Sequence, residues 1–250
     1  MTNGSDLSLP SLLVGFYGHW WPSRHESPRH LDAYSAFLAR STSFGLEAGP
    51  SISTASASWE LQEAELIDRG DTAGRLSWFQ VGMAPGGSHV PVSELIACGW
   101  SVLTEFGSVS LEAVQVQVPM VGELRADERL KWSSSLVNSA AGGPGATGAT
   151  IHVEHGAFVP ANSVVSNFDV LAGGLPVGVE EISRPEPAMS VRPETIDRWG
   201  WSPDAESWFK AAVAEWTVDA IAWTASAIVQ AFYNSGYRGT LGLTIGERSV

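Results

Sequence analysis

A chain of 250 residues, 44% hydrophobic and 16% charged, is long and apolar enough to fold as one large domain or two small ones, which excludes an intrinsically disordered protein. The 27 acidic and 14 basic residues give a net charge of −13. That charge repels phosphate backbones, so a nucleic-acid partner is disfavoured and a basic partner is favoured.

The sequence pattern of the first half of the chain predicts a series of strands and helices. Residues 11–18 form an apolar run typical of a buried strand. The next residues, GHWWPSRHESP at 18–28, predict a loop. Ser27 followed by Pro28 predicts the start of a helix over 28–40. The later elements are a segment of undetermined type at 59–68, a strand at 75–83, a helix at 91–106 and an alternating strand at 111–120.

The sequence pattern of the second half predicts a similar series, which ends in a long helix and a final strand. Ser202 and Pro203 are the expected cap and first residue of that helix. The predicted elements are a helix at 126–140, strands at 148–155 and 163–172, a mainly irregular segment at 173–203, the helix at 204–234 and a strand at 240–245.

One order of elements fits the chain twice. Strand, helix, two strands, helix and strand fit residues 11–121, and they fit 111–246 if the strand at 111–120 serves both halves or lies between them. This is the ferredoxin-like βαββαβ order. We therefore predict an α+β protein, with helices on one face of an antiparallel sheet. The two halves are expected at 1–122 and 123–250 and can form one compact domain.

The stretch GATIHVEHGAFVPANSVV holds His152 and His155 with Glu154 between them. Successive side chains of a strand point to opposite faces, so these two histidines cannot bind one ion from a regular strand. A helix would bring them together, but the β-branched residues after a glycine-rich run favour a strand. No metal site and no cofactor are expected. If the protein is an enzyme, the acid–base candidates are His19, His152, Glu154 and His155.

Other catalytic motifs are missing from the sequence. There is no GxSxG, HExxH, GxxxxGK[ST] or strand-linked GxGxxG pattern. The single cysteine, Cys98, excludes an internal disulfide and a cysteine-based zinc site, and its apolar neighbours favour a place in the core.

Two segments are candidates for a binding surface. The loop at 18–28 combines tryptophan, arginine and histidine, and the segment at 59–71 is the densest acidic patch in the chain. The candidate contacts are Trp20, Trp21, Arg24, His25, Glu60, Glu63, Glu65 and Asp68. The alternative for the loop is a solvated segment with one tryptophan in the core. The alternative for the acidic patch is that its charge only keeps the protein soluble.

The tryptophan-rich helix predicted at 204–234 is expected to pack in the core, with a homodimer through it as an alternative. The apolar run at 211–232 contains Glu215, Asp219 and Gln230, so a buried helix fits it better than a membrane span. The N-terminus has no basic region before its short apolar run and does not resemble a signal peptide. We expect a cytoplasmic protein.

Two stretches resemble a class of bacterial immunity proteins that are paired with polymorphic-toxin nucleases. HWWPSRHESPRHLDAYSAFLA is similar to that family's N-terminal Trp-Pro-Arg, Glu-Ser and Leu…Phe-Leu pattern, and IHVEHGAFVPANSVV is similar to its Pro-Asn-Ser-Val-Val segment. Together they cover about 35 of the 250 residues. The resemblance implies a non-catalytic cytosolic protein that binds a cognate toxin and blocks it.

Three hypotheses follow. The first is a non-catalytic binding protein, an immunity-type inhibitor of a basic toxin or enzyme. The second is an enzyme on a tandem ferredoxin-like scaffold that uses histidine and glutamate on a small ligand. The third is a structural or assembly subunit.

Overall fold

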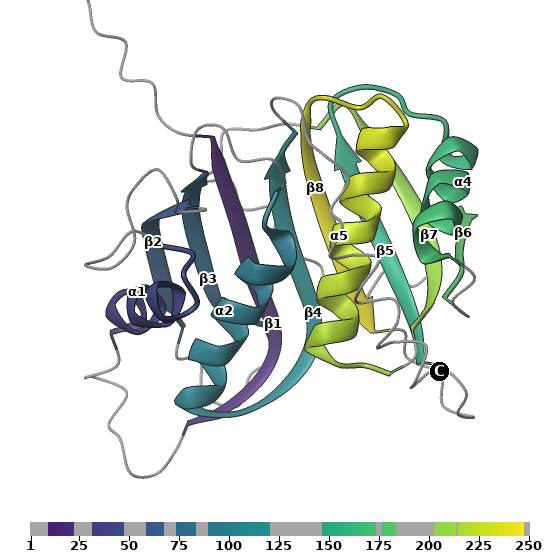
Figure 1. Ribbon diagram of the computed structural model, residues 1–250. Helices are drawn as coiled ribbons and strands as arrows, with labels where there is room; N and C mark the ends of the chain where they lie inside the picture. Colours follow the sequence, from purple (N-terminus) through teal and green to yellow (C-terminus); the bar gives the residue numbers. More distant parts are fainter. Residues whose placement is uncertain are drawn as a thin grey trace, which may run out of the picture.

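The computed structural model describes residues 10–22, 32–47, 59–67, 74–83, 90–120, 147–173, 177–183, 203–213 and 215–247. These residues form one antiparallel sheet of eight strands, and all the described helices cover the same face of it (Figure 1). The predicted α+β class, with an antiparallel sheet and helices on one face, is confirmed.

Among the described residues, each half of the chain has the element order βαββαβ. The first half consists of β1 (Ser11–Pro22), α1 (Ala33–Ser43), β2 (Trp59–Leu66), β3 (Gly74–Met83), α2 (Val92–Glu105) and β4 (Gly107–Pro119). The second half consists of β5 (Thr147–His155), α4 (Ala161–Ala172), β6 (Val179–Ile182), β7 (Ala205–Val213), α5 (Val218–Asn234) and β8 (Thr240–Glu247). The second series begins at β5, so the strand at 111–120 is not shared between the halves.

The strands run β2-β3-β1-β4-β8-β5-β7-β6 across the sheet (Figure 1). Within each half, the fourth strand pairs with the first, the first with the third, and the third with the second. The halves join where β4 pairs with β8, in a register that places Val116 opposite Leu243. Above this joint, α2 packs against α5, so one helix layer continues across both halves.

The core lies between the sheet and the helices. On β4, the predicted alternation is confirmed: Val114, Val116 and Val118 face the helices and are at most 1% exposed. Gln115 points to the opposite face and is also buried. Its amide oxygen accepts a hydrogen bond of 2.9 Å from the Tyr17 hydroxyl, which offsets its loss of hydration. The strand predicted at 240–245 is β8, whose Leu241, Leu243 and Ile245 share the helix face.

The strand predicted at 163–172 is wrong, because these residues lie in helix α4. Val164, Phe168 and Ala172 recur at intervals of four and are buried together, which is helical periodicity. Pro160 occupies the N-cap position, and Gly173 ends the helix in the left-handed conformation.

The long helix predicted at 204–234 is also wrong in its first part, because residues 205–213 form strand β7 and the helix begins at Val218. Phe209, Ala211 and Val213 alternate onto the helix face, the pattern of a strand. The side chain of Thr217 caps α5 by accepting from the Ala220 N–H. Residues 221–232 of α5 are all buried within the chain, so the helix is a core element; a homodimer through it stays a prediction.

The N-terminal elements differ from the prediction in their limits. Strand β1 continues through Trp20 and Trp21 to Pro22, where a loop was expected. Helix α1 is capped by Asp32, whose carboxylate accepts from the N–H groups of Tyr34 and Ser35, and so it starts later than the predicted cap at Ser27.

The remaining predicted elements of the first half agree with the structure where it describes them. The segment of undetermined type at 59–68 is strand β2 over Trp59–Leu66, and the predicted strand at 75–83 is β3. The helix at 91–106 is confirmed as α2. The helix predicted at 126–140 lies outside the described residues, as does the boundary between 122 and 123. None of the described helices is both long and apolar enough to cross a membrane.

Candidate functional site

Strand β2 forms one edge of the sheet and carries the predicted acidic patch. Glu60, Glu63 and Glu65 are exposed. Their register with β3 places all three side chains on the face of the sheet away from the helices. Within the described residues, no lysine or arginine forms an ion pair with any of them. Among the described residues, an acidic surface without ion-paired lysine or arginine therefore follows the edge of the sheet.

One of these glutamates has a structural partner. The indole N–H of Trp78, on the neighbouring strand, donates to the Glu65 carboxylate at 2.6 Å. The side chains of Glu60 and Glu63 make no such contact with described residues. Changes at Glu60 and Glu63 therefore alter surface charge without removing a hydrogen bond from Trp78, which is only 3% exposed.

The first part of the outer edge of β2 is already occupied by the chain itself. The Trp59 N–H donates to the Leu46 carbonyl at 3.2 Å. The Leu61 N–H donates to both carboxylate oxygens of Glu47, at 3.1 and 3.0 Å. The Tyr34 hydroxyl donates to the Leu61 carbonyl at 3.3 Å. The Glu47 side chain thus accepts the hydrogen bond that a neighbouring strand would otherwise accept. Burial raises the pKa of this carboxyl group.

His19 and Trp21 lie near the end of β1, on the same face as the glutamates. The His19 ring stacks on Trp21 with centroids 6.0 Å apart, and its Nε2 lies 3.2 Å from a carboxylate oxygen of Glu112. Trp21 is 48% exposed, whereas Trp20 points to the helix face and is 4% exposed. Of the two predicted contacts, Trp21 is the one available at the surface. Arg24, His25 and Asp68, predicted with them, lie outside the described residues.

His152 and His155 point to opposite faces of β5, as their spacing predicts. His152 stacks on Trp208 with centroids 4.0 Å apart, and its Nε2 lies 3.1 Å from a carboxylate oxygen of Glu206. Glu154 shares this face and lies directly opposite Glu206 in the register. These four side chains form a surface that a partner can cover, but His152 already interacts with the neighbouring carboxylate of Glu206.

His155 is 1% exposed on the helix face. Its Nδ1 lies 2.7 Å from the Ala157 carbonyl, and its Nε2 lies 3.0 Å from Ser207 Oγ. A carbonyl only accepts, so Nδ1 carries the proton and Nε2 accepts from the serine hydroxyl. Burial lowers the pKa of His155, because the imidazolium form would lose its hydration.

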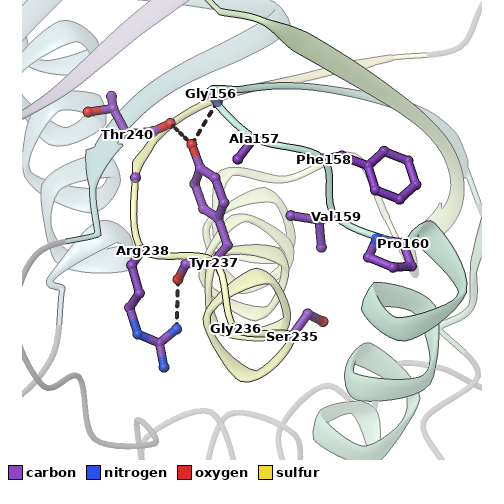
Figure 2. Close-up of a pocket in the computed structure, with 11 residues that line it drawn as sticks. Gly156, Ala157, Phe158, Val159, Pro160, Ser235, Gly236, Tyr237, Arg238 and Thr240 are labelled. Atoms are coloured by element: carbon purple, nitrogen blue, oxygen red, sulfur yellow. Dashed lines mark hydrogen bonds between the residues drawn. The ribbon is translucent and has the colours of Figure 1, made fainter.

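A cavity of about 520 Å³ lies beside His155, between the loop after β5 and the loop after α5 (Figure 2). The hydroxyl of Tyr237 ties the two loops together, accepting from the Gly156 N–H at 2.9 Å and donating to the Thr240 carbonyl (Figure 2). Arg238 donates to the carbonyls of Tyr233 and Tyr237 at 2.6 and 2.7 Å. The Tyr237 hydroxyl and one nitrogen of the Arg238 guanidinium are thus engaged in holding the walls of this cavity.

The four predicted acid–base residues do not form one site. His155 faces the helices, whereas His19, His152 and Glu154 face away from them. The backbones of His19 and His152 are separated by three strand spacings of ~4.8 Å across the sheet and by four residues of ~3.3 Å along β1. These two directions are perpendicular, so the straight-line distance is roughly 19 Å. The part of the chain that the structure describes contains no group of three His, Cys, Asp or Glu side chains that could hold a metal ion. The catalytic alternative stays a prediction.

Cys98 is buried, as its apolar neighbours predict. Burial raises the pKa of its thiol to about 12, so the thiolate that a nucleophile needs is disfavoured at neutral pH.

The sequence did not indicate Glu47, Tyr34 or Trp78, which shape the edge of β2. Each acts across the fold, on a strand that lies at least 13 residues away in the chain. A glutamate that precedes a strand, as Glu47 does, predicts a cap on the strand's backbone only if that strand is already known to lie at the edge of the sheet.

No protein-family model, no curated protein and no solved structure matches this chain.

Proposed function

We propose that this protein is a non-catalytic, cytoplasmic binding protein that holds a basic protein partner and blocks it, as an immunity-type inhibitor does. The observation that carries the proposal is the acidic edge of β2, where Glu60, Glu63 and Glu65 are exposed on one face without a cationic partner among the described residues. The resemblance to immunity proteins of polymorphic toxins supports the inhibitory role.

Charge gives this edge a physical role in association. Complementary charge accelerates encounter and selects among partners, and it adds less to the lifetime of the complex than buried contacts do. The chain has a net charge of −13, so the field around the edge is reinforced by the rest of the molecule. A basic enzyme or toxin is the class of partner that this field attracts.

The scaffold supports the same proposal. The βαββαβ order of each half, and the strand order within it, are those of a ferredoxin-like unit. We infer that the protein is a tandem of two such units. A rigid sheet of this kind presents a fixed row of charges at its edge, so the partner meets a surface that is already formed.

The test compares wild-type protein with two variants of equal net charge. Glu60→Lys/Glu63→Lys reverses the acidic edge but leaves Glu65 bonded to Trp78. Glu181→Lys/Glu215→Lys makes the same change in charge elsewhere on the exposed surface. Each tagged protein is used to capture partners from extract of the native cell, with mass spectrometry of the eluate.

We expect wild type and the Glu181→Lys/Glu215→Lys control to retain one basic protein in a fixed ratio. We expect the Glu60→Lys/Glu63→Lys variant to retain about tenfold less of it, chiefly through slower association, with a weaker dependence on salt. Equal retention of the basic protein by all three proteins would show that the acidic edge does not contribute to partner binding. A retained small molecule without a protein partner would favour the catalytic alternative, and self-association alone would favour the assembly alternative.

A further inference from the structure

Within the part of the chain that the structure describes, nothing pairs with the outer backbone edge of β2 beyond Leu61. The Ile67 N–H donates to the Leu76 carbonyl at 2.7 Å, so the backbone at Ile67 faces β3. Because backbone groups alternate along an antiparallel strand, Ala64 and Leu66 face the other way. Neither their N–H groups nor their carbonyls bond to any residue in the described parts of the chain.

The side chains along this open stretch have two different sides. Glu63 and Glu65 point to the face away from the helices and are exposed. Ala64 and Leu66 point to the helix face, where they are half-buried against the core. An added strand would meet acidic groups on one face and an apolar surface on the other, since cross-strand neighbours on the same face are in contact.

We propose that residues 62–66 of β2 bind an extended segment of the protein partner as a ninth strand, in which basic residues alternate with apolar ones. The partner's basic side chains pair with Glu63 and Glu65, and its apolar side chains cover Ala64 and Leu66. Backbone hydrogen bonds supply affinity, and the alternating side chains supply specificity. This inference deepens the proposed function and depends on it.

The chain itself limits where such a strand can bind. Glu47 and Leu46 satisfy the outward N–H groups of Leu61 and Trp59, so the added strand starts after Leu61. A second copy of this edge is a poor occupant, because its glutamates would lie against the same glutamates. The acidic side chains therefore protect the edge from self-association while they leave it open to a basic strand.

The first experiment uses a defined probe. A blocked peptide of alternating lysine and valine, about seven residues long, is titrated into the full-length protein at low salt. We expect it to bind, and we expect the amides of Ala64 and Leu66 to gain protection from hydrogen exchange while those of Val179 and Glu181 do not. A peptide of the same composition, N-methylated at every residue, keeps its charge but has no backbone N–H donor on either edge and is expected to bind far more weakly.

The second experiment removes one outward backbone donor. Ala64→Pro deletes the Ala64 N–H without removing a hydrogen bond to β3, and proline is tolerated at such edge positions. Glu181→Pro is the matched control on β6 at the opposite edge, where the bond from Ala212 N–H to the Gly178 carbonyl shows that Glu181 also faces outward. We expect Ala64→Pro to weaken peptide binding about tenfold and Glu181→Pro to leave it unchanged.

Three results would overturn the strand-addition proposal: equal binding of the N-methylated peptide, unchanged amide exchange at Ala64 and Leu66 on binding, or no binding of the alternating peptide at ~1 mM. The exchange measurement uses wild-type protein, so it decides the matter even if Ala64→Pro does not fold. If the Glu60→Lys/Glu63→Lys variant loses its captured partner and Ala64→Pro keeps it, the acidic binding surface stands and strand addition fails. If neither variant loses the partner, both proposals fail.

Discussion

At the scale of single residues, His155 shows most directly how burial sets chemistry. Its ring is enclosed by the core and bonded through both nitrogens, to the Ala157 carbonyl and to Ser207. The same bonds fix the start of the loop that forms one wall of the cavity (Figure 2). A histidine held in this way has a structural task, and its protonation state is coupled to folding.

We expect the protein to lose stability as the pH falls below about 6.5, the pKa of histidine in an unfolded chain. Burial lowers the pKa of His155 in the folded state, so between the two pKa values the unfolded chain binds a proton that the folded chain does not. The free energy of unfolding then falls by at most about 1.4 kcal/mol per pH unit for this one proton. Urea denaturation at several pH values measures the slope.

The control for this prediction is His155→Gln, which cannot titrate but keeps a polar group in the site. Its free energy of unfolding is expected to be lower than that of wild type at neutral pH and to change less below pH ~6.5. Identical slopes for the two proteins would show that His155 titrates normally in the folded state.

Some of these residue-level features follow from the sequence and others do not. The opposite orientation of His152 and His155 follows from the alternation of a strand, and so does the exposure of Glu63 and Glu65 once β2 is a strand. The bond from the Leu61 N–H to Glu47 does not, because it depends on which residues the fold brings beside β2. Local periodicity says which face a residue occupies but does not identify its neighbours.

At the scale of elements, the close contact between α2 and the sheet is set by a glycine. A Cβ atom at Gly99 would lie 2.7 Å from the Phe16 ring and 2.9 Å from the Phe79 ring, which is closer than carbon atoms pack. Phe16 and Phe79 are fully buried and pack edge to face, so neither ring has free space into which it can move.

We expect Gly99→Ala to lower the free energy of unfolding by about 1–3 kcal/mol, even though alanine favours helix more than glycine by ~1 kcal/mol. Chemical denaturation measures the change. Gly178→Ala is the matched control, because a Cβ there meets nothing within 4 Å. A Gly99→Ala protein as stable as wild type would show that α2 can move away from β1 and β3 at little cost.

The elements that the sequence predicted correctly are those with one clear period. Strand β4 alternates valine and glutamine, and α2 is a long apolar helix that stops near a glycine. Helix α4 was misread because its Val164, Val165 and Val170 favour strands, although the buried positions recur every four residues. Strand β7 was misread because its alanines fit a helix equally well, and only packing on β5 and β6 decides its state.

At the scale of the whole molecule, the two halves are expected to unfold together. The pairing of β4 with β8 makes one sheet, and α2 and α5 pack against each other over that joint. One continuous hydrophobic cluster includes residues from both halves, among them Phe16 and Phe209. Two halves that share a core and a hydrogen-bonded ladder stabilise each other.

Hydrogen exchange at increasing urea concentration measures this coupling. We expect amides of β1, in the first half, and of β5, in the second, to lose protection at the same denaturant midpoint. Two separate midpoints would show that the halves are independent folding units that happen to be adjacent.

The two edges of the sheet are formed by β2 and β6, which hold equivalent places in the two halves but differ in length, with eight and four residues. Among the described residues, both edges keep two outward backbone positions, Ala64 and Leu66 on β2 and Val179 and Glu181 on β6, so the repeat supplies two similar termini of the ladder. If the acidic surface selects the β2 edge as proposed, a complex formed by strand addition has a stoichiometry of one partner segment per chain, whereas two segments per chain would show that the β6 edge accepts a strand as well.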